Sequence, residues 1–121
     1  MTAGPEYLNR RAAGYIARDL LIKQGFEVVR VAERHSTTRT GFHLIAWNDQ
    51  SGVIFIRVRG SRIRRTSCSL QEELSLLCAH VLTRRYPGEL QYWVRDGDTW
   101  TRYRIYAGGA VRIPEAGSDI R

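Results

Sequence analysis

The stretch Phe42–Arg59 constrains the fold of this chain more than any other part of the sequence. It contains two apolar runs of strand length, joined by the polar residues Asn48–Gly52, whose composition is that of a turn. Both runs are apolar on both faces, which is typical of central strands that are covered on each side. If the turn takes these five residues, Trp47 faces Val53, and opposed residues point to the same side of the sheet. One face is then apolar except at one end, which gathers His43, Arg57 and Arg59.

This pattern of strand, turn and strand with a polar cluster at one end resembles the core of the PD-(D/E)XK nuclease superfamily. The resemblance is to the archaeal Holliday-junction-resolvase-like and restriction-endonuclease-like group, and it covers about residues 8–106. In that family the first strand carries an Asp, and the second carries Glu or Gln, any residue, and then Lys. The matching positions here are His43, within Gly41–Ala46, then Arg57 and Arg59. The resemblance implies a restriction-endonuclease-like α/β fold with an αβββαβ core, in which helices flank a central mixed sheet.

The three matching residues depart from the chemistry of the family. Carboxylates in such a nuclease hold a divalent cation that activates water, and hard cations prefer oxygen ligands. Guanidinium groups are always charged, only donate hydrogen bonds and would repel that cation, and one imidazole beside them is not a metal site. The family often adds a Glu in the first helix, but that position falls near Ala13 or Gly14. We therefore expect a degenerate nuclease motif with no catalytic residue, no metal and no cofactor.

Positive charge is concentrated in the middle of the chain. The net charge is +7, and 18 of the 19 basic residues are arginines. A G+C-rich genome can explain an excess of arginine, but not its placement. Eight arginines lie between Val28 and Gln71, against two acids, Glu33 and Asp49. Charge gathered in this way is typical of a protein with a polyanionic partner.

Two polar stretches carry most of this charge. Glu33–Gly41 is rich in hydroxyls and arginine, and is either a phosphate-contacting loop or a solvated connection. Gly60–Ser67 interleaves arginines with small residues and contains no acid, so it is the strongest candidate for a phosphate-contacting surface. The predicted nucleic-acid-binding set is Arg39, His43, Arg57, Arg59, Arg62, Arg64 and Arg65.

The remaining elements follow from spacing and cap signals. We expect one domain over residues 1–114 and a C-terminal tail over residues 115–121. A helix should begin near Pro5 and stop at Gly25, and a second helix should begin at Ser69 with a capping box to Glu72. The first expected strand is Phe26–Val31, and the two central strands follow it. Leu90–Arg95 should run parallel to Val53–Arg59, and Thr99–Tyr106 should follow across the turn Asp96–Asp98. After these we expect a bend at Ala107–Ala110 and a short edge strand at Val111–Ile113.

Three functions fit these observations. The first is a catalytically inactive nuclease-fold protein that binds double-stranded or branched DNA, as a cytoplasmic homodimer without a membrane segment. The second is a structural or oligomerisation domain without a nucleic-acid role, in which the arginines pair with acids such as Glu72, Glu73, Asp96 and Asp98. The third is an active metal-dependent nuclease whose ligands have migrated to acids such as Asp19, Asp49, Glu72 and Glu73. The direction of the arginine side chains discriminates between the first two.

Overall fold

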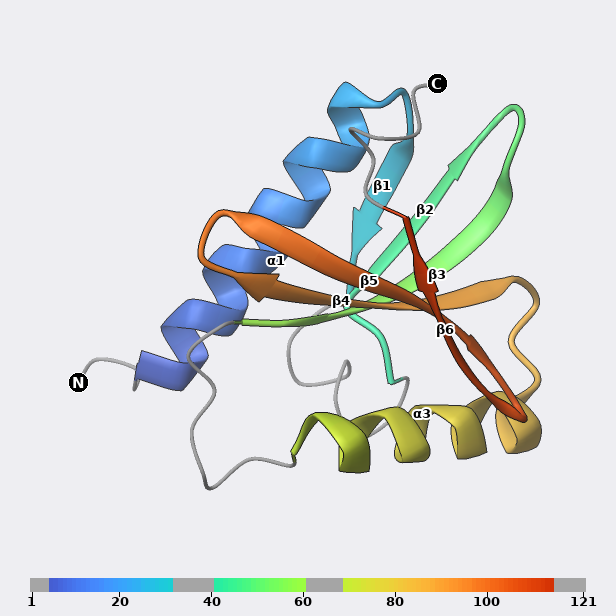
Figure 1. Ribbon diagram of the computed structural model, residues 1–121. Coiled ribbons are helices and arrows are strands. Elements are labelled where there is room, and N and C mark those ends of the chain that lie inside the picture. Colours follow the sequence, from blue (N-terminus) through green and yellow to red (C-terminus); the bar gives the residue numbers. More distant parts are fainter. Residues whose placement is uncertain (1–4, 32–40, 61–68, 115–121) are drawn as a thin grey trace.

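The protein is described here from a computed structural model that covers residues 5–31, 41–60 and 69–114, with side chains of the first helix from residue 13 onward. Its elements are α1 (Pro5–Lys23), β1 (Glu27–Arg30), β2 (Leu44–Asn48), β3 (Gly52–Arg59), α3 (Leu70–Arg84), β4 (Glu89–Asp96), β5 (Thr99–Tyr106) and β6 (Gly109–Ile113). Figure 1 shows the two helices packed against a twisted sheet. The predicted C-terminal tail, residues 115–121, lies outside the described residues.

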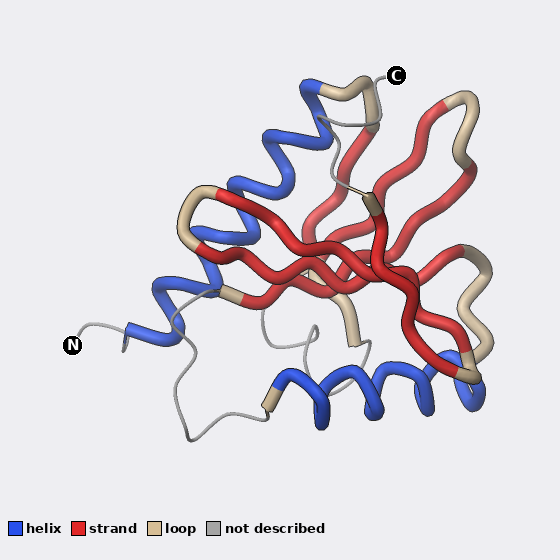
Figure 2. Tube along the Cα trace, viewed as in Figure 1, coloured by secondary structure: helices blue, strands red, loops and turns tan. Residues whose placement is uncertain are grey.

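The strands form one six-stranded mixed sheet in the order β1-β2-β3-β4-β5-β6. Neighbouring strands are antiparallel except β3 and β4, which are parallel, as the sequence predicted. The tube in Figure 2 shows tight turns from β2 to β3, from β4 to β5 and from β5 to β6, whereas the chain between β3 and β4 includes α3. The expected mixed α/β architecture, a central mixed sheet flanked by helices, is therefore confirmed.

The two helices cover opposite faces of the sheet. On one face α1 packs its Ala13, Ala17 and Leu21 against alternate residues of β2 and β3. On the other face α3 packs Leu77 against a cluster that includes Phe55, Leu90, Tyr92 and Ile105. The alternation of side chains along β2 to β4 thus feeds two separate hydrophobic cores, which is why these strands are apolar on both faces.

The hairpin between β2 and β3 has the predicted register, with Trp47 opposite Val53 and Asn48 opposite Gly52. The Asn48 side-chain oxygen accepts hydrogen bonds from the backbone N–H groups of Gln50 and Ser51 at 2.9 and 2.6 Å. Gly52 has a φ of 68°, a left-handed conformation that glycine adopts without a steric cost. This turn chemistry fixes which residues of the hairpin share a face.

Helix α3 has the predicted N-terminal cap. The Ser69 hydroxyl accepts from the Glu72 backbone N–H at 3.1 Å, and the Glu72 carboxylate accepts from the Ser69 backbone N–H at 2.9 Å. After the helix, a Cβ added at Gly88 would lie 2.3 Å from the Val53 carbonyl oxygen. Only glycine lets the chain approach β3 this closely, and this contact begins the parallel pairing of β4 with β3.

The C-terminal strands differ from expectation in one respect. Residues Ala107–Ala110, expected to be a bend, include a tight turn in which Tyr106 pairs with Gly109, so β6 begins at Gly109. The β4–β5 hairpin also decides which aromatic residue accompanies Trp93. Trp100 is its partner, with ring centroids 5.5 Å apart, whereas Tyr103 stacks on Tyr92 at 6.2 Å on the other face.

Candidate nucleic-acid interface

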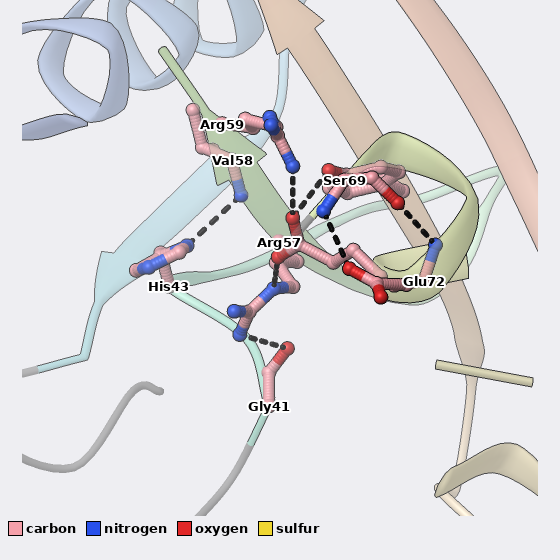
Figure 3. A network of polar contacts seen from close by, with 9 residues as sticks. Gly41, His43, Arg57, Val58, Arg59, Ser69 and Glu72 are labelled. Atoms are coloured by element: carbon pink, nitrogen blue, oxygen red, sulfur yellow. Dashed lines mark hydrogen bonds and ion pairs between the residues drawn. The ribbon is translucent and has the colours of Figure 1, made fainter. Parts of the chain in front are cut away.

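A buried carboxylate joins the two arginines of β3 to helix α3. Glu73 Oε2 accepts from Arg57 Nε, and Glu73 Oε1 accepts from Arg59 Nη1 at 2.9 Å. The Tyr92 hydroxyl of β4 also donates to Glu73 Oε1, at 2.6 Å. The side chain of Glu73 is 10% exposed, and those of Arg57 and Arg59 are 14% and 16% exposed. We call these four residues the Glu73 network, of which Figure 3 labels Arg57 and Arg59.

Local structure places each member of the network. Arg57 and Arg59 are two residues apart on a strand, so both side chains point to the α3 face of the sheet. Glu73 lies in the first turn of α3, three residues after Leu70 and four before Leu77, on the stripe that packs against the sheet. Tyr92 is opposite Arg57 in the parallel β3–β4 register. The side chains of these four residues meet between the first turn of α3 and the neighbouring strands β3 and β4.

The contacts within the Glu73 network determine which of its side chains carry a charge. Burial by itself would raise the pKa of Glu73, but the charge of Arg57 and the hydrogen bonds from Tyr92, Arg57 and Arg59 outweigh it and lower that pKa. Burial opposes the charge of Arg59, yet its interactions with Tyr92 and Glu73 raise the pKa of Arg59. Burial and the neighbouring Glu73 raise the pKa of Tyr92, so its hydroxyl remains protonated and donates. The network therefore contains one carboxylate and two guanidinium groups, with a surplus of positive charge.

His43 lies beside this network but bonds to the backbone. Its Nδ1 accepts from the backbone N–H of Val58, the residue between the two arginines, at 2.9 Å. The backbone is irregular here, since the His43 N–H donates to the Ile56 carbonyl at 2.8 Å while Leu44 is the register partner of Ile56. Two residues thus oppose one, as in a β-bulge, and Phe42 packs with Phe55 on the α3 face. The structure brings Arg57 and Arg59 together at Glu73, and places His43 against the strand that carries them.

The ends of both arginine-bearing stretches lie next to the network. Segment 32–40 leaves the described structure after Val31, whose N–H donates to the His43 carbonyl at 2.8 Å, and returns at Gly41, whose carbonyl accepts from Arg57 Nη1 at 3.4 Å. Segment 61–68 leaves after Gly60, adjacent to Arg59, and returns at the helix cap Ser69. Figure 3 shows Gly41 beside Arg57, and Ser69 on the helix turn that faces the strand. Four of the predicted binding residues, Arg39, Arg62, Arg64 and Arg65, lie outside the described residues.

Several described arginines away from the network also have acidic or aromatic neighbours. Arg104 Nε lies 3.1 Å from a Glu89 carboxylate oxygen, and Arg95 lies 3.7 Å from Asp98. The guanidinium of Arg30 lies 4.2 Å from the centre of the Tyr15 ring and donates to its hydroxyl. Arginine side chains that pair with acids or aromatic rings of the protein favour a structural role. These arginines and those of the Glu73 network point toward such groups, so their roles are structural.

Glu73 and Tyr92 were not predicted as a unit. The sequence analysis named Glu73 only as one of several acids, and Tyr92 only as part of a strand. The available signal was the position of Glu73 within the apolar stripe of its helix, because a carboxylate on a buried face needs a partner. On the sheet, the corresponding signal in the sequence was the presence of two arginines on a central strand, which need a negatively charged partner when they are buried.

Within residues 13–31, 41–60 and 69–114, no three His, Cys, Asp or Glu side chains lie close enough to hold a metal ion. The Glu73 carboxylate, beside Arg57 and Arg59, already accepts hydrogen bonds from three donors. A cation at this place would face two guanidinium groups, which repel it.

Comparisons with protein-family models and with curated proteins gave no significant match to this chain. The helices that the structure describes are too short or too polar to cross a bilayer.

Proposed function

We propose that this protein binds nucleic acid, double-stranded or branched DNA, through segments 32–40 and 61–68. The observation that supports this proposal is that three of the four ends of the two segments adjoin the Glu73 network, and that the fourth, Val31, bonds to His43 beside it. The two segments contain five arginines and a single acid, Glu33. The described residues that flank the two segments lie at one end of the sheet. Phosphate contacts require such a concentration of charge.

In this proposal the Glu73 network is the structural base of the interface. Three ionised side chains that hold one another in place fix the directions in which the two segments leave the sheet. The network also adds one surplus positive charge near the bound phosphates. The arginines of the network therefore favour binding by holding the segments in place and by adding positive charge. Neither arginine has to leave Glu73 for this.

The fold that best agrees with the proposal is a restriction-endonuclease-like core without its chemistry. In favour of it are the mixed sheet, the hairpin of β2 and β3, and the parallel pairing of β3 with β4 through a helix. At the positions matching the acid and the lysine of the family stand Arg57 and Arg59, and these two hold the nearby carboxylate themselves. We expect the protein to be a cytoplasmic homodimer that binds DNA and does not cleave it.

The direct test is a titration of labelled duplex and four-way-junction DNA with the protein at several salt concentrations. We expect the logarithm of the affinity to fall linearly with the logarithm of salt concentration, by about 0.9 for each phosphate neutralised. Replacing Arg62, Arg64 and Arg65 together by Gln should make this slope shallower by up to about three such steps. Absence of salt-sensitive binding by the unaltered protein at moderate ionic strength would disprove the proposal.

A matched control uses Arg84 and Arg85, which are also exposed and close in sequence but lie at the end of α3. Arg84 is suited to the negative end of the helix dipole, so it has a structural reason to exist. Replacing both by Gln should leave the salt slope nearly unchanged. An equal loss of slope in both variants would show that binding follows total charge rather than this interface.

A second candidate function is a structural or oligomerisation domain. It is favoured by the pairing of Arg57 and Arg59 with Glu73, and by the exposed apolar side chains of Val29, Trp47 and Val53, which are 48%, 38% and 39% exposed. Sedimentation of the protein with and without DNA separates the two candidates. Self-association that is insensitive to salt, with no DNA in the sedimenting species, would favour this second function.

The third function, an active nuclease, is tested by incubating the same DNA with Mg²⁺ or Mn²⁺ and comparing it with chelator. We expect no cation-dependent cleavage. Cleavage that disappears with chelator would require acids that move into position only in the bound state.

A further inference from the structure

The α3 face of the sheet exposes apolar side chains next to the β2–β3 turn. Ile45 and Phe55 belong to the hydrophobic cluster under α3. Trp47 and Val53 are each two residues nearer the turn, so they point to the same face and lie opposite each other. Val29 of β1 joins them, because it is opposite Ile45. We call the three exposed residues Val29, Trp47 and Val53 the hairpin patch; α3 lies away from the turn beside it (Figure 1).

Opposite charges flank the hairpin patch. On its β1 side, Glu27 is directly opposite Trp47 and is exposed. On its β3 side, the Tyr86 ring packs against Phe55 with ring centroids 5.6 Å apart. Arg85, the exposed C-cap of α3, immediately precedes Tyr86. The surface therefore has an apolar centre between an acidic side and a basic side.

We propose that the hairpin patch is the contact between two copies of this chain, packed face to face around a two-fold axis parallel to β2 and β3. Such an axis places the β1 side of each copy against the β3 side of the other. Glu27 of one copy then meets Arg85 of the other, and the two apolar centres meet each other. A two-fold contact uses the same surface twice, so it needs a surface that is complementary to itself. The opposite charges on the two sides of the patch satisfy this requirement.

The charge of the whole chain also favours this surface. The net charge is +7, so two copies repel each other where their arginine-rich surfaces approach. At the hairpin patch, Glu27 balances Arg85, and the centre has the apolar and aromatic composition that is usual for the core of an interface. Because the patch is small, we expect a dimer that dissociates on dilution. The inference goes beyond the proposed function, since the contact includes none of the residues proposed to bind DNA.

The first test follows self-association by sedimentation equilibrium, without DNA, from micromolar to submillimolar protein. We expect a monomer–dimer equilibrium, which Trp47→Gln should weaken roughly ten-fold or more, because aromatic residues at the centre of an interface carry much of the binding energy. Val111→Gln is the matched control, since Val111 is 53% exposed but lies on β6, at the far edge of the sheet. Equal effects of the two substitutions would overturn the inference. A monomer at every concentration would also overturn it, in favour of a partner other than this chain.

The second test exchanges the flanking charges. Glu27→Arg and Arg85→Glu should each weaken the dimer several-fold, because each substitution creates two pairs of like charges across the axis. An equimolar mixture of the two variants should restore association, since both opposed pairs then have opposite charge. A fluorescent label on one variant reports the mixed dimer. Restoration also shows that both variants are folded, whereas no gain on mixing would refute the two-fold contact and leave the proposed function intact.

Discussion

The Tyr92 hydroxyl donates a hydrogen bond to Glu73 Oε1 over 2.6 Å, and so joins the middle of the sheet to helix α3. The same carboxylate holds Arg57 and Arg59, so one side chain fixes two neighbouring strands and a helix relative to each other. Buried ion pairs of this kind contribute little when they are compared with a well-packed apolar core. Removal of one partner is nevertheless costly, because it leaves the other charges buried and uncompensated. The first predictions follow from this asymmetry.

Glu73→Gln should lower the free energy of unfolding by about 3–5 kcal/mol at neutral pH, because two partly buried guanidinium groups lose their counter-charge. Urea denaturation followed by circular dichroism measures this change. The control is Glu27→Gln on the exposed face of β1, which should change stability by less than about 0.5 kcal/mol. A loss of similar size in the two variants would show that Glu73 does not hold the helix to the sheet.

The contribution of Glu73 should also depend on pH. Its pKa in the folded protein is lowered, despite the opposing effect of burial, by Arg57 and by hydrogen bonds from Tyr92 and both arginines. The stabilisation is then fully present above the ordinary glutamate pKa of about 4.3, and is lost as the pH falls from there through the lowered folded-state pKa. The difference in unfolding free energy between the unaltered protein and Glu73→Gln should be constant from neutral pH to about pH 5.5 and shrink below about pH 4. A difference that grows on acidification would mean that the folded-state pKa is raised instead.

Tyr92→Phe removes a single donor from the network and keeps the ring that stacks on Tyr103. Because the hydrogen bond is made to a charged group in a buried setting, we expect a loss of about 1.5–3 kcal/mol in unfolding free energy. Tyr106→Phe is the control, since that side chain is half exposed. Equal stability of Tyr92→Phe and the unaltered protein would show that Glu73 Oε1 is satisfied without this hydroxyl.

Gly88→Ala should destabilise the protein by about 1–3 kcal/mol or more, because the new Cβ would meet the Val53 backbone where β4 approaches β3. Gly108→Ala is the matched control, since a Cβ at Gly108 has no atom within 4 Å among the neighbours that the structure describes. The two variants can be compared by thermal unfolding. If Gly88→Ala were as stable as Gly108→Ala, the start of the parallel pairing would have to be looser than it is here.

Much of the fold was predictable because its signals are local. The register of the first hairpin and the capping box at Ser69 each depend on a few adjacent residues, and both are present as predicted. The tight turn at Ala107–Ala110 was missed because small residues without an Asn-Gly or Asp-Gly pair give a weak turn signal. The mixed sheet was predictable because a helix lies in the chain between two neighbouring strands, and such a connection allows these two strands to run parallel.

The candidate site was harder to predict because its central contact is not local. Glu73 lies 16 residues from Arg57 and 19 from Tyr92 along the chain, and no periodic pattern links them. The alternation rule placed Arg57 and Arg59 on one face, as observed. The same rule did not foresee the irregular pairing at Ile56, where the His43 imidazole bonds to the Val58 N–H. An irregularity of one residue changes every expectation made from alternation beyond it.

The parallel pairing of β3 with β4 divides the sheet into two halves that are each contiguous in sequence, β1–β3 and β4–β6. Each half is assembled from close neighbours along the chain, and only the step that joins them closes a long loop. That loop contains segment 61–68 and α3, and the same step brings Glu73 to its arginines. A chain that has folded only one half would thus lack the Glu73 network on which the proposed interface depends, so DNA affinity, if the proposal holds, should report complete assembly of the domain.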